Sequence, residues 1–246
     1  MYERRLLARL SGSPMPRHVG VILDGNRRWA RSAGLDDPRE VYRAGGRKIA
    51  QFLGWCDDAG VEVVTLWLLS TDNLARPTNE LEPLLRVIEA VALDLSGSGR
   101  PWKVRAVGAL DLLPAETSRV LKHAEERTEQ RTGATVNVAV GYGGRQEIAD
   151  AVRSLLHEHA SRGTSIEQLA DLLDVDHIAE HLYTRGQPDP DLLIRTSGEQ
   201  RLSGFLLWQS AHSEFYFCDA YWPDFRHVDF LRALRDYAAR NRRFGN

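Results

Sequence analysis

Short apolar runs alternate with stretches of helical periodicity along most of the chain. Apolar runs of strand length, rich in valine, leucine and isoleucine, are typical of buried strands. The sequence predicts strands at six places: 18–23, 61–70, 103–107, 135–140, 192–195 and 214–218. Between them, apolar residues recur every three or four positions, which is the spacing of one face of a helix.

Two amphipathic helices are predicted between the first three strands. One apolar face is formed by Tyr42, Ile49, Leu53 and Cys56, and the other by Leu81, Leu84, Leu85, Ile88 and Leu95. Further helices are predicted at 114–131, 145–159 and 228–240. Strands that alternate with helices predict an α/β fold, with a central, mostly parallel six-stranded sheet flanked by helices.

The whole chain, residues 1–246, is predicted to form one domain, because its length suits a single core. The segments 96–99 and 186–190 have the composition of loops within that domain. Residues 1–15 are predicted to form an N-terminal helix or a tail. Arginines among the first ten residues exclude a signal peptide. They leave two interpretations open, a frayed terminal helix and a basic amphipathic helix that touches a bilayer.

Composition narrows the classes of partner. The formal net charge is -2, with 43% hydrophobic and 27% charged residues, which is typical of a globular protein. Such a chain has no overall positive field, so no nucleic-acid partner is predicted. Cys56 and Cys218 lie far apart in the sequence, so neither a zinc site nor a disulfide framework is indicated, and a reducing cytoplasm is expected. No run approaches the roughly 18 apolar residues of a membrane span.

Polar segments follow four of the predicted strands. They lie at 24–29, 70–76, 141–145 and 195–201. In an open parallel sheet, ligands bind beyond the carboxyl ends of the strands, where loops and helix N-termini converge. An active-site cleft is therefore predicted at this edge of the sheet.

The first of these segments combines a carboxylate with phosphate-binding groups. Asp24 directly follows the first strand, and Gly25, Asn26, Arg27 and Arg28 come next. A carboxylate oxygen suits Mg²⁺, and backbone amides and guanidinium groups bind phosphate oxygens. The pattern predicts a metal-bridged diphosphate site, although Asp-Gly-Asn taken alone is also a common turn.

The second segment contains Ser70, Asn73 and Arg76, spaced so that a loop or first helical turn could direct all three at one ligand. A structural alternative makes Ser70 a helix cap and Asp72 a first-turn acid. The two interpretations are compatible, because capped helix N-termini bind anions.

The last segment adds Arg195, Arg201 and Ser203, whose donors suit a second diphosphate. Surface ion pairing would explain either arginine equally well.

Three other motifs are weak. Residues 36–40 are similar to the acidic DDxxD box of all-α terpenoid enzymes, but here they span a proline just before a predicted helix. Residues 141–144 lack the last glycine of GxGxxG, with Gln146 in its place, so a tight strand-to-helix turn is expected. His157 and His159 are two residues apart on a helix and do not face one ligand.

Taken together, five ordered segments resemble one enzyme family. They are residues 18–31 (HVGVILDGNRRWAR), 69–77 (LSTDNLARP), 140–145 (VGYGGR), 190–199 (PDLLIRTSGE) and 205–209 (FLLWQ). They resemble the undecaprenyl diphosphate synthase family of cis-prenyl transferases, from about residue 16 to 245. The resemblance implies a magnesium-dependent enzyme that joins isopentenyl diphosphate to an allylic diphosphate and leaves a Z double bond.

The resemblance also implies roles for the matching residues. Asp24 is similar to the catalytic aspartate that holds magnesium on the diphosphate, and Glu214 to a second acidic group near that metal. The loop that cradles the allylic diphosphate is matched by Gly25, Asn26, Arg27, Arg28 and Trp29. The family's active-site segment is matched by Ser70, Thr71, Asp72, Asn73, Leu74 and Arg76. The isopentenyl diphosphate pocket is matched by Arg195, Arg201, Leu202 and Ser203.

Asn73 matches the position that the family often labels as proton acceptor. A neutral carboxamide is a very weak base, so we expect Asn73 to orient the substrate while a diphosphate oxygen takes the proton, with Ser70 as a relay. The family is homodimeric, and its closing R-x-G signature, here Arg243-Phe-Gly245, is thought to reach towards the partner's site. A cytoplasmic homodimer is therefore expected, and peripheral membrane contact through the apolar product stays open.

The chain departs from the long-chain pattern of the family. Tyr42 stands where a histidine is expected, and Gln200 replaces a second histidine. An expected arginine falls on Pro38, with Arg39 one position out of register, and Leu74 replaces a tryptophan. At least one phosphate contact of the family therefore has no obvious donor here.

Leu68 and Leu69 end the second strand, where long-chain members tend to have a small residue and then an aromatic one. A bulky side chain in the wall of an apolar tunnel shortens the product that fits, so Leu68 is a candidate tunnel floor. Packing between strand and helix is the alternative role.

The resemblance is closest to short-chain members, which make (2Z,6E)-farnesyl diphosphate from geranyl diphosphate. A medium- or long-chain synthase of a lipid carrier is the main alternative, and an irregular coupling enzyme is a third. A non-catalytic partner subunit is disfavoured, because Asp24, Asn26 and Arg28 are all present.

Overall fold

A single parallel sheet forms the centre of the computed structural model, which describes residues 2–240. Within that range six strands form the sheet, in the order β3-β4-β2-β1-β5-β6, and every neighbouring pair is parallel. The strands are β1 His18–Ile22, β2 Val63–Ser70, β3 Lys103–Val107, β4 Thr135–Tyr142, β5 Leu192–Arg195 and β6 Glu214–Phe217. The predicted strands are confirmed, and the sheet is wholly parallel where a mostly parallel one was expected. The Arg243-Phe-Gly245 signature lies outside the described residues.

The ends of two strands differ from the prediction. β2 begins at Val63 and not at residue 61, because the backbone amide of Glu62 already bonds to the carbonyl of Arg17 outside the ladder. β4 runs on to Tyr142, which still pairs with Ser70 across a register shift. All five residues of β1 are buried, as expected for a parallel sheet covered on both faces.

Nine α-helices and four 3-10 helices occur between residues 2 and 240. The α-helices are α1 Tyr2–Leu10, α2 Asn26–Ala33, α3 Pro38–Asp58, α4 Thr78–Ser96, α5 Ala115–Thr128, α6 Gly144–Ser161, α7 Ile166–Leu172, α8 Val175–Ala179 and α9 His227–Ala239. The 3-10 helices are η1 Asp72–Ala75, η2 Leu110–Leu112, η3 Gln209–His212 and η4 Trp222–Asp224. The helices predicted at 114–131, 145–159 and 228–240 are confirmed as α5, α6 and α9. Neither α7 nor α8 was predicted.

Two apolar cores lie on opposite faces of the sheet. The larger one joins β1, β2 and β4 to α3, α4, α5 and α9, and Phe52 of α3 packs edge-on against Trp222 and Phe230 in it. The smaller core lies on the other face, where Phe205 and Leu206 cover Ile22 and Tyr142. This second core places the segment after β5 over the carboxyl ends of the central strands.

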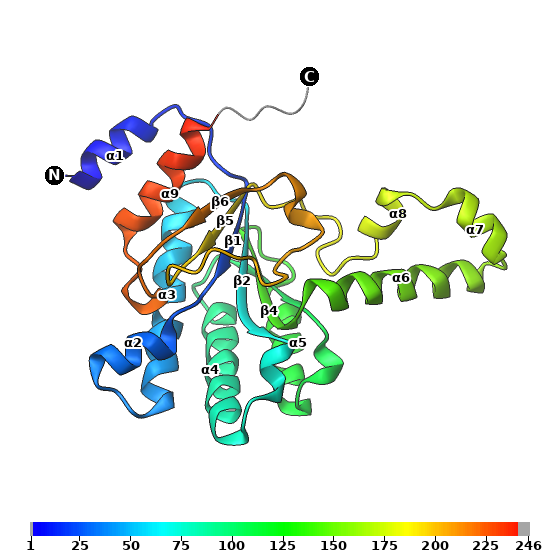
Figure 1. Ribbon diagram of the computed structural model, residues 1–246, viewed down its shortest axis with the longest axis horizontal. Coiled ribbons are helices and arrows are strands. Elements are labelled where there is room, and N and C mark those ends of the chain that lie inside the picture. Colours follow the sequence, from blue (N-terminus) through cyan, green and yellow to red (C-terminus); the bar gives the residue numbers. More distant parts are fainter. Residues whose placement is uncertain (1, 241–246) are drawn as a thin grey trace.

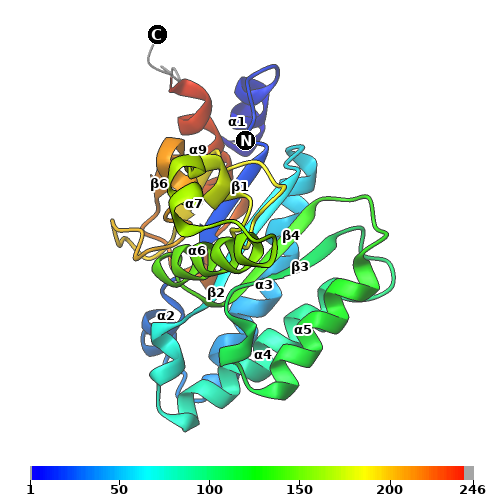
Figure 2. The same ribbon diagram turned by 90° about the vertical axis from the view of Figure 1, so that its right-hand side faces the viewer.

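The helix α6 projects away from the sheet, with α7 at its far end and α8 beside it (Figure 1). This α6–α8 arm carries several exposed apolar side chains. They are Leu156, Ile166, Leu172, Leu173 and Val175. In the view turned by 90°, α6 and α7 lie in front of the sheet (Figure 2).

The N-terminal segment forms a helix that packs on the body of the protein. Leu6 and Leu10 of α1 are buried, and α1 contacts α9. Among residues 2–240, no helix combines the length and the apolar character needed to cross a membrane.

Two of the weak motifs have structural roles. The Asp37 carboxylate caps α3 by accepting a hydrogen bond from the Arg39 backbone amide at 2.8 Å. Gly143 and Gly144 form the tight turn from β4 to α6, and the Gly144 amide bonds to the Gly204 carbonyl at 3.0 Å. The two cysteines are buried and unpaired.

A buried polar network lies at the amino ends of the central strands. The His18 Nδ1 donates to the Pro188 carbonyl at 2.7 Å, so its Nε2 accepts from the Thr65 hydroxyl at 2.7 Å. The Thr65 oxygen in turn accepts from the Asn137 amide at 2.8 Å. Burial disfavours the charged imidazole and lowers the pKa of His18 to about 4.

This pKa predicts a loss of stability in mild acid. Between the ordinary histidine pKa and about pH 4, the unfolded chain binds a proton at His18 that the folded chain does not, so stability falls as the pH falls. From pH 7 to pH 5 the group should remove about 2 kcal/mol from the free energy of unfolding. Urea unfolding at both pH values, in the parent and in His18→Gln, measures this. An equal fall of the free energy of unfolding in His18→Gln, between pH 7 and pH 5, would show that His18 is not its cause.

Candidate functional site

A cleft of about 650 Å³ lies at the carboxyl ends of β1, β2 and β5, where the sequence predicted it. Its walls come from the turn between β1 and α2, from η1, and from the segment after β5. Most of the predicted site residues line it: Asp24, Gly25, Asn26, Arg27, Arg28, Leu68, Ser70, Asp72, Asn73, Arg76, Arg195, Arg201 and Ser203. Residues from three distant parts of the chain thus meet in one hollow.

Besides Glu214, four predicted residues lie outside this lining. The Trp29 indole donates to the Asp224 carboxylate of η4 at 2.9 Å. Leu202 packs with the smaller core, and Leu74 with the larger one. Thr71 lies against Gly143, where an added Cβ would come within 2.6 Å of its hydroxyl oxygen. These four side chains are better placed to fix the walls than to touch a ligand.

Glu214 lies at the amino ends of the strands, opposite the end that carries the cleft. It is the first residue of β6 and pairs with Leu192, the first residue of β5, whereas Asp24 follows the last residues of β1. Because all strands run parallel, the two carboxylates are at opposite ends, and Glu214 pairs with Arg240 instead. The expectation that Glu214 and Asp24 share one metal does not hold within a single chain.

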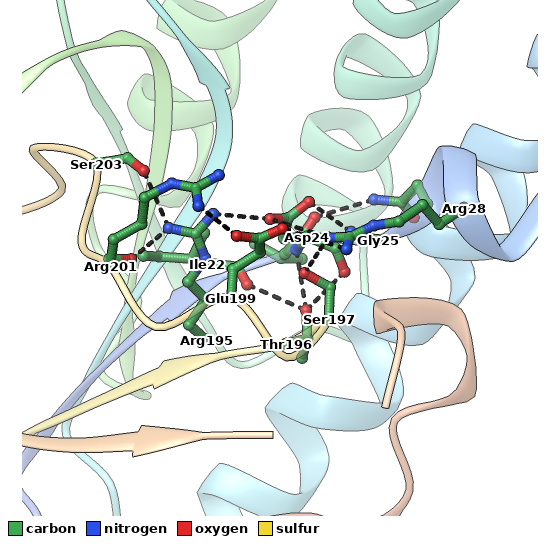
Figure 3. Close-up of polar contacts among 12 residues, drawn as sticks. Ile22, Asp24, Gly25, Arg28, Arg195, Thr196, Ser197, Glu199, Arg201 and Ser203 are labelled. Carbon is green, nitrogen blue, oxygen red and sulfur yellow. Dashed lines mark hydrogen bonds and ion pairs between the residues drawn. The ribbon is translucent and has the colours of Figure 1, made fainter. Parts of the chain in front are cut away.

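The Asp24 carboxylate is the centre of the polar contacts in the cleft (Figure 3). One oxygen accepts from the Gly25 amide at 2.7 Å, and the other from the Arg195 guanidinium at 2.8 Å. The Arg28 guanidinium lies 3.8 Å from the second oxygen. Burial by itself raises the pKa of Asp24, but the Arg195 and Gly25 hydrogen bonds outweigh it and hold the pKa below its ordinary value.

The backbone around Asp24 is fixed by Thr196, which the sequence analysis did not assign. The Thr196 hydroxyl accepts from the Asp24 amide at 2.9 Å and lies 2.7 Å from the Asp24 carbonyl oxygen. Gly25 has φ 99°, and an added Cβ would lie 2.6 Å from Tyr221 and 2.9 Å from Ser197. Only glycine fits this turn without displacing its neighbours.

The turn brings the N-terminus of α2 to the cleft. Asn26 is the first residue of α2, after Gly25 at the capping position. The first amides of a helix lack acceptors within the helix and carry partial positive charge, so they bind anions. The Arg28 guanidinium on the same turn donates to the Ser197 hydroxyl at 2.7 Å.

Arg195 links this turn to the segment after β5. Its guanidinium donates to the Ser203 hydroxyl at 3.0 Å and to the Arg201 carbonyl, besides its contact with Asp24. The residue is buried, and its Nε has no hydrogen-bond partner within the described part of the chain. A buried guanidinium with a free donor is suited to an incoming anion.

Glu199 is a further lining residue without a predicted role. Its carboxylate lies 3.2 Å from the Arg28 guanidinium and also pairs with Arg201 (Figure 3). The sequence contained the residue in its SGE segment, but no local pattern indicates a partner as distant as Arg28. Arg31 and Trp67 are other lining residues that the sequence analysis did not assign.

Asn73 is held by its neighbours in the η1 segment. Its side-chain oxygen accepts from Arg76 Nε at 3.0 Å, and its backbone amide donates to the Ser70 hydroxyl at 3.2 Å. Ser70 thus accepts from an amide of η1 as a cap would, although Thr71 occupies the capping position. The Asn73 side-chain NH₂ forms no hydrogen bond with residues 2–240 and can donate to a ligand.

The polar cleft borders an apolar hollow. A space of about 50 Å³ adjoins it, and both are lined by Leu23, Asn26, Tyr42, Leu68 and Leu84. The small space in turn shares four residues with a groove of about 570 Å³ between α3 and α4: Gly46, Ile49, Val87 and Val91. Tyr42 thus lines the cleft where the family has a histidine, while Arg39 lines the α3–α4 groove.

These features define an α/β protein with a site for phosphorylated ligands that carry apolar tails. The model of the family described as "Putative undecaprenyl diphosphate synthase" matches residues 22–245. The chain belongs to this family of cis-prenyl transferases, as the resemblance implied.

Named relatives match the chain over its full length. It is 68% identical to a (2Z,6E)-farnesyl diphosphate synthase of Thermobifida fusca, over 100% of this chain and 96% of the relative. It is 56% identical to a short-chain Z-isoprenyl diphosphate synthase of Mycobacterium bovis, over 100% and 94%. Among solved structures, lavandulyl diphosphate synthase from Lavandula x intermedia with dimethylallyl diphosphate matches with a TM-score of 0.86. That match has 34% identity and covers 94% of this chain and 99% of the other.

The contacts of Thr196 predict a measurable role in stability. Thr196→Val removes a buried hydroxyl but keeps its shape. The Asp24 amide and carbonyl both lose their contact with this hydroxyl, and the amide keeps only its bond to the Ile22 carbonyl at 2.9 Å. The free energy of unfolding should fall by about 1–3 kcal/mol. Thr135→Val at the start of β4 is the control and should change it by less than about 0.5 kcal/mol. Equal values from urea unfolding of the two variants would exclude the role.

Proposed function

We propose that this chain is a short-chain Z-isoprenyl diphosphate synthase. It joins isopentenyl diphosphate to geranyl diphosphate, forms (2Z,6E)-farnesyl diphosphate and releases diphosphate. The observation that carries the proposal is one cleft that contains Asp24, Arg28 and Arg195 and borders a hollow beside Leu68. The names of the relatives at 56% and 68% identity support the same product.

The allylic diphosphate is proposed to bind at the N-terminus of α2. Backbone amides at the start of the helix and the Arg28 guanidinium are suited to its phosphate oxygens. Gly25 allows the ligand to approach the backbone closely, because it has no side chain. As the bond from C1 to the diphosphate oxygen breaks, these donors stabilise the negative charge of the leaving diphosphate.

Isopentenyl diphosphate is proposed to bind beside it, at Arg195, Arg201 and Ser203. The Arg195 side chain already touches both Asp24 and Ser203, so it lies between the two diphosphate sites. This arrangement holds the double bond of one substrate near C1 of the other, and the bond between them forms as diphosphate leaves. Fixing two reactants in this way supplies part of the rate acceleration.

Magnesium is the metal that we propose for this site. Bound Mg²⁺ would neutralise charge on the departing diphosphate. Asp24 fits as its protein ligand, because its lowered pKa keeps it ionised, and Mg²⁺ usually takes one or two carboxylates together with substrate phosphates and water. Residues 2–240 contain no group of three or more His, Cys, Asp or Glu side chains placed to hold a metal, so most ligands would come from substrate and water.

Asn73 is proposed to orient the substrate and not to act as a base. Its oxygen is occupied by Arg76, which directs the remaining NH₂ donors of the carboxamide to other partners. A diphosphate oxygen is a stronger base and takes the C2 proton of isopentenyl diphosphate, with the Ser70 hydroxyl as relay.

The apolar tail of the product is proposed to enter the hollow beside Leu68. Leu68 is half-buried and lines both the cleft and the 50 Å³ hollow. A side chain at this boundary limits how far a tail can extend towards the α3–α4 groove.

We also propose that the chain is a cytoplasmic homodimer that forms one domain over its full length. The α6–α8 arm supports this, because its exposed apolar side chains would be buried by a second copy. The chain's membrane contact would be peripheral and would come through the apolar product.

The product assay tests the proposed reaction directly. With radiolabelled isopentenyl diphosphate, geranyl diphosphate and Mg²⁺, the purified chain should make a C15 product. Asp24→Asn should lower the rate at least about a hundredfold, because the variant loses the charge that binds the metal. Asp72→Asn is the control. Asp72 also lines the cleft but is not a proposed metal ligand, so the rate of this variant should fall less. A ladder of products beyond C20 would identify a longer-chain synthase instead.

The boundary role of Leu68 predicts a change in product length. Leu68→Ala should shift the main product from C15 to one or more additional C5 units, because it opens the way to the α3–α4 groove. Leu110→Ala removes a partly buried leucine that lines none of the cavities described above, and it should leave the length unchanged. Thin-layer chromatography of the dephosphorylated products measures both. The same product from Leu68→Ala as from the parent would exclude Leu68 as the tunnel floor.

A further inference from the structure

Glu199 is directed into the cleft by an unusual turn. Ser197 and Gly198, the two residues before it, have φ values of 82° and 76°. Their amides are fixed to the carbonyls of Ala220 and Cys218, at 2.8 and 2.9 Å. The direction of the Glu199 side chain is therefore set by backbone contacts from outside the cleft.

The carboxylate of Glu199 lies between arginines of the two proposed diphosphate sites. One oxygen lies 3.2 Å from Arg28, which belongs to the allylic site, and the other pairs with Arg201, which belongs to the isopentenyl site. Figure 3 shows the carboxylate between the two guanidinium groups. A carboxylate and a phosphate use the same donors of an arginine, so both cannot occupy them fully at once.

We propose that Glu199 is an internal counter-anion that competes with diphosphate for Arg28 and Arg201. The inference rests on the proposed function and extends it to product release. In the empty cleft, Glu199 neutralises and orients the two arginines. A bound diphosphate displaces it, and the return of the carboxylate to the arginines promotes the departure of the product diphosphate.

The exposed fractions of the three side chains determine how strongly Glu199 lowers the affinity for diphosphate. Glu199 and Arg28 are partly exposed, with 27% and 42% of their side-chain surfaces accessible, and Arg201 is 65% accessible. Solvent screens such pairs, so each one contributes modestly. Loss of the carboxylate removes two competing pairs and one negative charge beside a polyanionic ligand, and the affinity for diphosphate should therefore rise.

The test compares two neutralising substitutions by calorimetry with inorganic pyrophosphate. Glu199→Gln removes the competing charge. Glu62→Gln is the matched control, because Glu62 forms a 2.8 Å ion pair with Arg17 at the amino ends of the strands. Both variants change the net charge equally. Without Mg²⁺, Glu199→Gln should bind pyrophosphate about three- to tenfold more tightly than the parent, and Glu62→Gln equally to the parent.

A second measurement follows turnover with Mg²⁺ present. Pyrophosphate should inhibit Glu199→Gln at a concentration about three- to tenfold lower than it inhibits the parent, because release of the product is slower. A gain of affinity cannot result from a damaged fold, so it separates competition from a structural role.

Several results would overturn the inference. Equal or weaker binding of pyrophosphate by Glu199→Gln without Mg²⁺ would exclude competition. Weaker binding that appears only with Mg²⁺ would make Glu199 a contributor to the metal site instead. If the parent chain itself did not bind pyrophosphate, the proposed function would fail, and the counter-anion role with it.

Discussion

The contact between the Asp24 carboxylate and the Arg195 guanidinium is the constraint on which the site depends. It joins the ends of β1 and β5, the two strands whose following turns carry the proposed allylic and isopentenyl sites. Because Arg195 also holds Ser203 and the carbonyl of Arg201, one guanidinium fixes the distance between the two sites. The low pKa of Asp24 has the same origin, since the negative form is the one that Arg195 stabilises.

Charge and hydrophobicity are separated within a short distance in this cleft. The chain has a net charge of -2, yet six arginines line the cleft where the central strands end. Leu68 and Leu84 stand at the other boundary, next to the apolar hollow. A prenyl diphosphate has the same division between a charged head and an apolar tail, so the ligand class follows from the layout of the walls more than from any single residue.

The sequence was sufficient to predict the sheet, because buried parallel strands are short apolar runs that need no knowledge of their partners. It was also sufficient to predict that Asp24, Arg28 and Arg195 meet in one cleft, because they lie at or just after the ends of those runs. It could not indicate Thr196 or Glu199, whose partners lie about 170 positions away and meet them only through the pairing of β1 with β5. Glu214 was assigned to the metal from the family resemblance alone. Its position as the first residue of a parallel strand places it at the end of the sheet opposite to Asp24. Helices α7 and α8 escaped prediction because short, exposed segments carry little periodicity.

The pairing of β1 with β5 also has a consequence for biosynthesis. Asp24 and Arg195 are 171 positions apart, and the intervening chain contains three further strands and most of the helices. A nascent chain that has left the ribosome only as far as β4 can form part of the sheet, but it has no second wall for the cleft. Contacts of such long range form late and slowly. The ability to bind a prenyl diphosphate should therefore arise only once nearly the whole polypeptide has been translated.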